Sequence, residues 1–242
     1  MKQINSVNNE YIKELSKLKT KKYRDELGLF IVEGYHLVKE AKDYLVDVLI
    51  TNELDKVEGV NNILVTEDII KKLSFSQTPQ NIIGVCKMNV NDKLCGNRFL
   101  LLDNIQDPGN LGTLIRTALG FGIDTIVASL DTVDIYNDKV IRASQGALFH
   151  INYVKGNLLD IIPTLKLRGI KVIGTSLKSS IDLKKIDCSD NFAVILGNEG
   201  NGVSEDVLNL PIIICSMEKF LMISNPESQS LTFAKFSSTA SI

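Results

Sequence analysis

The sequence predicts an α/β protein whose larger domain is built around a mostly parallel sheet. Short apolar runs alternate with helical patterns along most of the chain, and this alternation is typical of β-α-β units. A polar, turn-rich stretch, residues 89–97, interrupts the alternation and is expected to be a linker. It separates a small amino-terminal α/β domain, residues 1–88, from a larger domain, residues 98–242.

The amino-terminal domain begins with a polar segment of helical character, residues 7–26, that carries excess positive charge. Up to Arg24 the basic residues are Lys2, Lys13, Lys17, Lys19, Lys21, Lys22 and Arg24, against the acids Glu10 and Glu14. This charge is either a solvated helix face or an electrostatic footprint for phosphate groups. Apolar runs then predict strands at 29–32, 45–50, 63–65 and 81–88, with helices after Glu33-Gly34 and from Thr66.

The composition narrows the possible functions. The chain has 242 residues, of which 44% are apolar, and a net charge of −2, so nucleic acid could be gripped only locally. It contains neither an apolar run long enough to span a membrane nor an export signal, so we expect no membrane partner. Its four cysteines lack CxxC spacing and it has two histidines, so we expect no metal site and a reducing cytoplasm.

The larger domain is organised around residues 98–118. They predict a strand at 98–102, a turn at Asp107-Pro108-Gly109-Asn110, and then a helix. The buried stripe of this helix consists of Leu111, Leu114, Ile115, Ala118 and Leu119. Arg116 lies off that stripe, near the loop. The segment is either an ordinary strand-turn-helix with a solvated arginine or a ligand site at a helix amino terminus.

The remaining elements continue the alternation. Strands are expected at 124–128, 170–174, 192–196 and 211–214, and helices at 134–149 with a break at Gly146, at 158–167, from Ser204, and at 233–242.

A glycine-rich loop, Gly197-Asn198-Glu199-Gly200-Asn201-Gly202, follows the strand at 192–196. Three glycines in six residues allow a ligand to approach the backbone closely, although a flexible surface turn would use the same residues. Its GxxGxG spacing differs from the dinucleotide fingerprint GxGxxG, and no P-loop lysine follows. A nucleotide-dependent oxidoreductase is therefore disfavoured.

Several motifs resemble one enzyme family. The run LLDNIQDPGNLGTLIRTA, residues 101–118, closely resembles the first signature of the SpoU (TrmH-type) RNA ribose methyltransferases, members of the SPOUT superfamily. The glycine-rich loop resembles the second signature, and Arg142-Ala143-Ser144-Gln145-Gly146-Ala147 a further family stretch. Ser230-Leu231-Thr232 aligns with the third signature, with Thr in place of the usual Asn, and Glu227-Ser228 is a competing alignment. Residues 21–41 resemble the substrate-binding domain that precedes many of these enzymes.

The resemblance implies an S-adenosylmethionine-dependent enzyme that methylates a ribose 2′-hydroxyl in RNA. The separate amino-terminal domain favours ribosomal over transfer RNA as the partner. The family also implies a carboxy-terminal trefoil knot and a homodimer. An RNA-binding relative with weakened catalysis is the alternative, because the third signature is altered.

Site residues follow from the matched motifs. Arg116 matches the family arginine, and we expect it to orient the ribose phosphate and stabilise the developing alkoxide, because a guanidinium already carries its proton and is a poor general base. The resemblance implies that Asn110 positions Arg116 or the ribose, that Glu199 orients the arginine, and that Ser230 supplies a hydroxyl. The residues implied for cofactor binding are Thr175, Gly197, Ile214 and Leu231.

Overall fold

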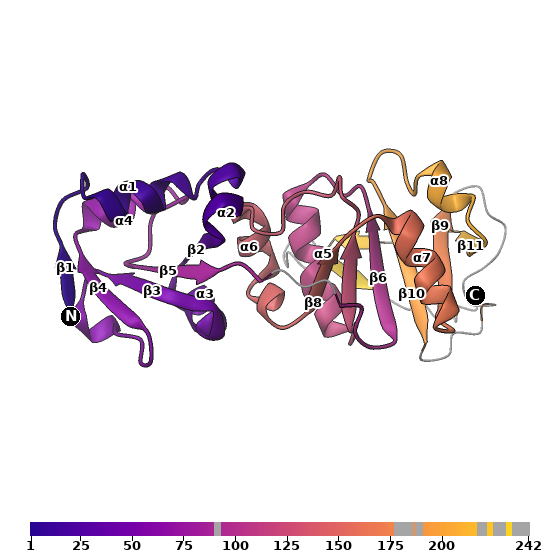
Figure 1. The fold of residues 1–242 in the computed structure, drawn as a ribbon, viewed down its shortest axis with the longest axis horizontal. Helices are drawn as coiled ribbons and strands as arrows, with labels where there is room; N and C mark the ends of the chain where they lie inside the picture. Colours follow the sequence, from indigo (N-terminus) through magenta and orange to yellow (C-terminus); the bar gives the residue numbers. More distant parts are fainter. Residues whose placement is uncertain (90–92, 177–185, 187–190, 217–221, 225–230, 234–242) are drawn as a thin grey trace, which may run out of the picture. The chain divides into compact units, whose positions relative to one another are not determined.

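The computed structural model describes residues 1–89, 93–176, 186, 191–216, 222–224 and 231–233 (Figure 1). The chain forms two compact units. Unit 1 contains Met1–Val90 and Asp134–His150, and unit 2 contains Asn91–Val133 and Ile151–Ile242. Over the described residues, the structure has no helix of the length and apolarity that a membrane crossing requires.

Unit 1 is built on a mixed five-stranded sheet. Its strands are β1 (Lys2–Ile4), β2 (Leu29–Glu33), β3 (Leu45–Ile50), β4 (Asn61–Val65) and β5 (Ile82–Lys87). Their order is β1-β4-β3-β5-β2, with β5 antiparallel to both of its neighbours and the other pairs parallel. The predicted strands are confirmed. The edge strand β1 was not predicted, because three residues are too few to show an alternation.

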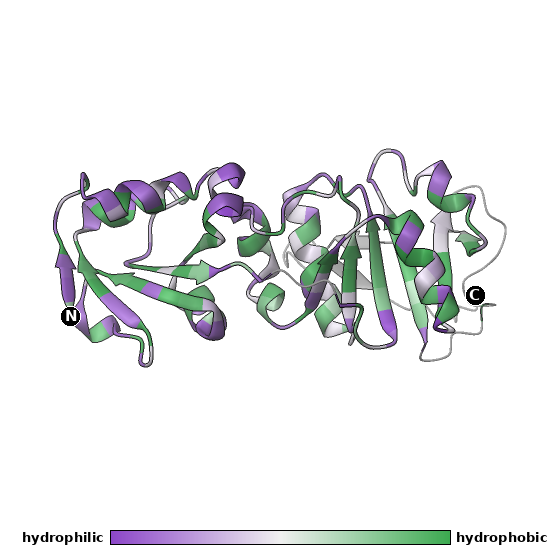
Figure 2. Ribbon diagram, in the orientation of Figure 1, coloured by the Kyte–Doolittle hydropathy of each residue, from purple (hydrophilic) through white to green (hydrophobic). Residues whose placement is uncertain are grey.

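Helices cover the sheet of unit 1. They are α1 (Glu10–Lys17), α2 (Lys21–Leu27), α3 (Tyr35–Glu40) and α4 (Glu67–Leu73). The predicted segment at residues 7–26 is two helices rather than one, because the chain is extended at Thr20, the residue before α2. Apolar side chains of α1 and α4 pack on the same core as those of β2, β3, β4 and β5. The outward faces of both helices are hydrophilic (Figure 2).

A segment distant in sequence completes unit 1. Asp134–His150, which contains α6 (Asp138–Ser144), packs against β2 and not with the residues that flank it. The Phe30 ring lies 4.6 Å from the Tyr136 ring and 6.3 Å from the Phe149 ring, measured between centroids. The predicted break is confirmed: Gly146 has φ +88°, and an added Cβ would lie 2.6 Å from Cγ of Glu40.

This segment changes the expected domain organisation. The prediction placed residues 134–150 in a domain spanning 98–242, whereas their contacts belong to unit 1. The division at the linker, residues 89–97, remains a prediction.

Unit 2 is built on a fully parallel six-stranded sheet. Its strands are β6 (Arg98–Asp103), β7 (Thr125–Ala128), β8 (Asn152–Lys155), β9 (Lys171–Ser176), β10 (Phe192–Gly197) and β11 (Ile213–Ser216), in the order β11-β9-β10-β6-β7-β8. The short strand β8 was not predicted. Adjacent sheet strands β6 and β10 are separated by almost ninety residues of chain, which the parallel connections in between occupy.

The helices of unit 2 are α5 (Pro108–Gly120), α7 (Leu158–Leu167) and α8 (Glu205–Leu208). Side chains of α7 and α8 share one apolar core with one face of the sheet. Alternate residues of β6, such as Leu100 and Leu102, face the other way and are also buried. The central strands β10, β6 and β7 are therefore apolar along most of their length (Figure 2), as expected for a parallel sheet covered on both faces.

The carboxy-terminal part departs from the prediction. Strands β12 (Met222–Ser224) and β13 (Leu231–Phe233) form an antiparallel pair, so the helix predicted from Phe233 does not begin there. Thr and Phe favour extended backbone, which agrees with a strand at this position. The rest of that helix, residues 234–242, lies outside the described residues, and the predicted knot remains a prediction.

The carboxylate of Asp124 holds the start of β6 through hydrogen bonds. Protonation of this carboxylate in acid should therefore destabilise unit 2. Its Oδ2 accepts hydrogen bonds from the backbone N–H groups of Asn97 and Arg98, both at 2.8 Å. These backbone hydrogen bonds lower the pKa of Asp124, so its stabilising contribution is present at neutral pH and is lost as pH falls through the lowered pKa. We expect Asp124→Asn to flatten the acid limb of a stability–pH curve, measured by urea unfolding. An unchanged acid limb would contradict this role.

Candidate functional site

The candidate site lies at the edge of the unit 2 sheet where the parallel strands β6, β9, β10 and β11 end. Register brings the predicted residues to this edge: Gly197 lies opposite Asp103 across β10 and β6, and Ile214 lies opposite Gly174 across β11 and β9. Thr175 follows Gly174 on β9. Three of the four residues expected to bind cofactor therefore lie on neighbouring strands, Thr175 and Gly197 near the strand ends and Ile214 within β11.

The helix that follows β6 begins earlier than predicted. Residues 107–110 were predicted as a turn before the helix, but α5 begins at Pro108, and Asp107 is its N-cap. Oδ1 of Asp107 accepts a hydrogen bond from the backbone N–H of Asn110 at 2.8 Å. Proline at the first helical position is favoured because it has no N–H to satisfy. Asn110 consequently lies in the first turn of α5, where the helix holds its backbone in place.

A hydrogen bond joins the first and second signature regions. Nδ2 of Asn110 donates to Oε1 of Glu199 at 2.9 Å, across 89 residues of sequence. Glu199 lies in the glycine-rich loop that follows β10, whereas Asn110 lies on α5. The structure thus brings together two of the predicted catalytic residues.

Arg116 lies further along the same helix. The buried residues of α5 include Leu111, Leu114, Ile115 and Ala118, and Arg116 is partly exposed on another side. Arg116 follows Asn110 by six residues on the same helix, about 9 Å further along its axis. Its predicted role towards the ribose remains a prediction.

The glycine-rich loop is tightly folded. The backbones of Asn198 and Gly202 exchange hydrogen bonds at 2.9 and 2.8 Å. An added Cβ on Gly197 would lie 2.0 Å from the carbonyl carbon of Gly202, so glycine is required at Gly197 by the loop itself. The residues at the tip of the loop are exposed. The loop is a hydrogen-bonded turn.

The other predicted residues are placed as follows. Thr175 is buried, and its hydroxyl donates to the carbonyl of Ile195 at 3.0 Å, so its side chain is used within the sheet. Leu231 begins β13, which packs beside α5. Ser230 lies outside the described residues, and its role remains a prediction. No cluster of three or more metal-ligating side chains occurs in the described part of the chain.

Three residues of this edge were not singled out from the sequence. They are Asp103, Asn104 and Asn198. The Asp103 side chain accepts from the backbone N–H of Ser204, and the Asn198 side chain donates to the backbone carbonyl of Asn104, so these contacts connect the two loops. One signal was available, since an asparagine beside a glycine-rich turn often caps backbone N–H groups. The sequence could not show which backbone groups these side chains would meet.

Family models and related proteins of known sequence both match this chain. The model of the SpoU rRNA Methylase family matches residues 97–219, and that of the MRM3-like substrate binding domain matches residues 9–84. The chain is 40% identical over 215 residues to RlmP of Bacillus subtilis, a 23S rRNA (guanosine(2553)-2′-O)-methyltransferase, with 86% of this chain and 87% of the relative covered. It is 34% identical over 183 residues to mitochondrial rRNA methyltransferase 3 of Xenopus laevis, covering 66% of this chain and 44% of that protein.

Solved structures show the same architecture. The crystal structure of AdoMet-bound rRNA methyltransferase from Sinorhizobium meliloti superposes with a TM-score of 0.79 and 28% sequence identity. The match covers 89% of this chain and 88% of that one. It confirms the predicted α/β fold class with a mostly parallel sheet.

Proposed function

Because the chain belongs to the SpoU rRNA methylase family, we propose that it transfers a methyl group from S-adenosylmethionine to a ribose 2′-hydroxyl of ribosomal RNA. The observation that carries this proposal at the level of the site is the hydrogen bond between Asn110 and Glu199. It unites the two signature regions at one edge of the parallel sheet, which is where ligands bind in open α/β folds.

The residues at this edge fit the cofactor. Thr175 and Gly197 lie near the ends of β9 and β10, and Ile214 lies on the neighbouring strand β11, so their backbone amides and carbonyls could recognise an adenine edge and ribose hydroxyls. Since the Thr175 hydroxyl is bonded within the sheet, its backbone is the part that would contact adenine. Leu231, on the strand beside α5, would complete the binding surface. S-adenosylmethionine supplies a methyl group activated by its sulfonium.

The protein's own contribution is to position and polarise the acceptor. The positive charge of the Arg116 guanidinium would hold the ribose phosphate and stabilise the alkoxide that develops as the 2′-hydroxyl loses its proton to solvent. Asn110, bonded to Glu199, fixes one wall of the acceptor site. The Glu199 carboxylate would orient Arg116 through its charge. Ser230 would supply a further hydroxyl.

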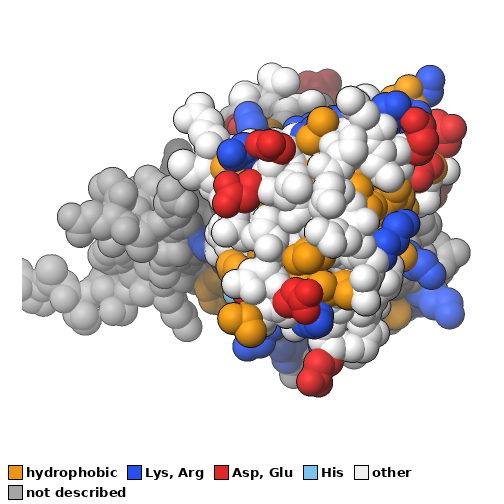
Figure 3. All heavy atoms as spheres, turned by 90° about the vertical axis from the view of Figure 1, so that its left-hand side faces the viewer, with side chains coloured by type: hydrophobic (Ala, Val, Ile, Leu, Met, Phe, Trp, Pro, Cys, Tyr) orange, Lys and Arg blue, Asp and Glu red, His pale blue; other side chains and the backbone are white. Residues whose placement is uncertain are grey.

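Unit 1 is proposed to bind the RNA around the target nucleotide. Its match to an MRM3-like substrate binding domain supports this, and the activity of RlmP makes 23S rRNA the first substrate to test. The face of unit 1 in Figure 3 carries Lys and Arg side chains interspersed with Asp and Glu. Any phosphate contact must therefore come from particular lysines and not from a uniformly basic surface.

The lysines of α1 and α2 differ in their availability. Lys13 and Lys21 each pair with an acid on their own helix, Glu10 and Asp25. By contrast, Nζ of Lys17 and Nζ of Lys22 lie 5.6 and 5.8 Å from the centroid of the Tyr23 ring, and neither lysine forms a salt bridge with a described residue. These two lysines are the better candidates for phosphate contacts.

Replacing Lys17 and Lys22 together by glutamine should weaken RNA binding and reduce its salt dependence. Each lost phosphate contact lowers the slope of log K against log salt by about 0.7 to 0.9. We expect the affinity for S-adenosylmethionine to stay unchanged. RNA affinity measured by filter binding at several salt concentrations tests this, with Lys56→Gln/Lys71→Gln on the same unit as the matched control. An unaltered slope of log K against log salt would refute the proposal that Lys17 and Lys22 contact RNA phosphates.

The direct test of the function uses labelled S-adenosylmethionine, purified protein and ribosomal RNA. Digestion of the product should release a 2′-O-methylated nucleoside. Binding of RNA without any transfer would instead support the binding-protein alternative. That alternative is favoured by one observation: Leu231–Phe233 form a strand where the third signature predicts a helix.

We also propose that the enzyme acts as a homodimer in the cytoplasm. The dimer follows from the family resemblance, in which two catalytic domains meet beside the cofactor pocket. Sedimentation of the purified chain tests it, and a monomer at micromolar concentration in the presence of cofactor would contradict it.

A further inference from the structure

The side chain of Asn198 ties the glycine-rich loop to the loop after β6. Its Nδ2 donates to the carbonyl oxygen of Asn104 at 3.0 Å. Its Oδ1 accepts from the backbone N–H groups of Gly200 at 2.9 Å and Asn201 at 3.2 Å. An amide has a donor at one end and an acceptor at the other, so one side chain both closes its own loop and reaches the neighbouring one.

The partner of this contact is itself held in place. Asn104 adopts φ +59°, which is unusual for any residue except glycine. Its backbone N–H donates to Oγ of Ser129 at 2.9 Å, on the loop that follows β7. Two hydrogen bonds therefore fix the backbone at Asn104. Its N–H donates to Ser129, and its carbonyl accepts from Asn198.

A second contact holds the far end of the glycine-rich loop. Oδ2 of Asp103 accepts from the backbone N–H of Ser204 at 2.8 Å, and Asp103 is buried. Glu199 lies between this contact and that of Asn198, and its carboxylate accepts from Asn110. Two consecutive residues, Asp103 and Asn104, thus anchor both ends of the loop that presents Glu199.

We propose that Asn198 is a positioning residue for methyl transfer, acting by holding the Glu199 carboxylate against Asn110. The proposal rests on the function proposed above. Asn198 acts through Glu199, and its contacts are to backbone groups of the two loops. A displacement of about 1 Å in a positioned group can cost about a hundredfold in rate, so a single lost contact here has a measurable effect.

Asn198→Asp is the sharpest test. Aspartate keeps acceptor oxygens for Gly200 and Asn201, but it replaces the Nδ2 donor by an oxygen that repels the Asn104 carbonyl. We expect kcat to fall about tenfold to a hundredfold while KM for RNA changes less than about threefold. Asn201→Asp, the same substitution on the same loop, is the matched control and should stay within about twofold of the parent. Turnover by Asn198→Asp equal to that of the control would overturn the proposal.

A double-mutant cycle separates positioning from a general structural role. If Asn198 acts through Glu199, then Asn198→Asp should cost less than about threefold in kcat when Glu199 is already alanine. The same loss in both backgrounds would mean that Asn198 acts independently of Glu199, and would overturn the proposal.

Hydrogen exchange tests the contact between Asn198 and Asn104 separately from the proposed methyl transfer. Peptides covering residues 198–204 should exchange faster in Asn198→Asp than in Asn201→Asp, because the first substitution alone releases the loop from Asn104. Equal exchange would overturn the proposed contact even in an active enzyme. Absence of methyl transfer by the unmodified protein, with exchange as expected, would instead reject the proposed function and with it a positioning role in that reaction.

Discussion

Arg116→Ala is expected to lower kcat for RNA methylation by about a hundredfold to a thousandfold, the usual cost of removing a group that stabilises a developing oxyanion. Arg116 lies off the buried stripe of α5, the helix that also carries Asn110. Cofactor binding should persist, because the proposed cofactor contacts come from strand ends and not from this helix. Single-turnover kinetics with S-adenosylmethionine titration by calorimetry measures both quantities.

Arg116→Lys is the informative companion. Lysine keeps the positive charge but lacks the planar fork that binds a phosphate through two hydrogen bonds. We therefore expect partial activity, well below that of the unmodified protein and above that of alanine. Full activity in the alanine variant, with the protein folded, would remove Arg116 from the mechanism.

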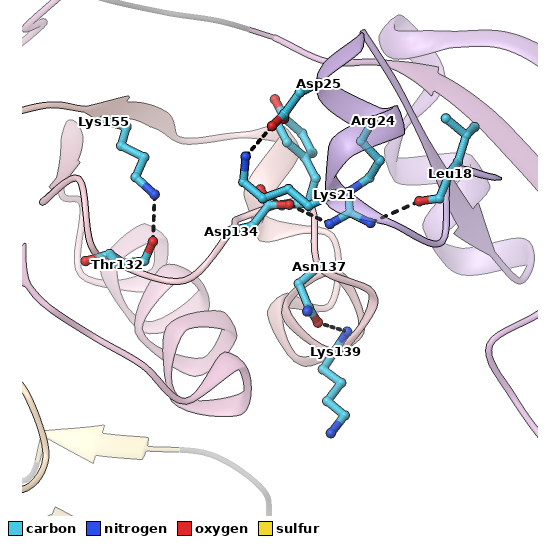
Figure 4. A network of polar contacts seen from close by, with 10 residues as sticks. Leu18, Lys21, Arg24, Asp25, Thr132, Asp134, Asn137, Lys139 and Lys155 are labelled. Atoms are coloured by element: carbon cyan, nitrogen blue, oxygen red, sulfur yellow. Dashed lines mark hydrogen bonds and ion pairs between the residues drawn. The ribbon is translucent and has the colours of Figure 1, made fainter. Parts of the chain in front are cut away.

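Asp134→Ala should destabilise unit 1 by about 3–5 kcal/mol, because it leaves a buried guanidinium without its counter-charge. Nη2 of Arg24 donates to Oδ2 of Asp134 at 2.6 Å, and Nη1 donates to the carbonyl of Leu18 at 3.0 Å (Figure 4). The two side chains are only 6% and 13% exposed. The effect is measured as the free energy of unfolding in urea.

Matched variants distinguish the cost of an uncompensated buried charge from unspecific destabilisation by the substitution. In an Arg24→Met background, Asp134→Ala should cost much less, since the uncompensated charge is gone. Lys13→Ala breaks an ion pair whose side chains are 46% and 90% exposed, and should have almost no effect on the free energy of unfolding. Equal losses for Asp134→Ala in both backgrounds would show that the ion pair is not the cause.

Local pattern predicted most of the secondary structure. The strand at 45–50 and the helix at 158–167 have the predicted bounds, because each is a strongly patterned run closed by clear end signals. The start of α5 was placed too late, since Asp107-Pro108 fits both a turn and a helix cap. The strand at Leu231–Phe233 was missed because three residues show no period.

Long-range contacts set the limit of prediction from the sequence. The sequence predicts a helix at residues 134–149 with a break at Gly146, but no local pattern shows that Phe149 packs against Phe30 of unit 1. The meeting of Asn110 and Glu199 was expected only from the resemblance, since parallel connections separate them in sequence. Asn198 could be recognised as a loop residue, whereas its contact with the Asn104 carbonyl depends on how β6 and β10 lie side by side.

Mapping ribose methylation across ribosomal RNA from cells with and without this protein tests the central claim most directly. We predict that a specific ribose loses its methyl group when the protein is absent. The methyl group should return when the unmodified protein is supplied, but not when Arg116→Ala is supplied. An identical methylation map in both kinds of cell would contradict the account.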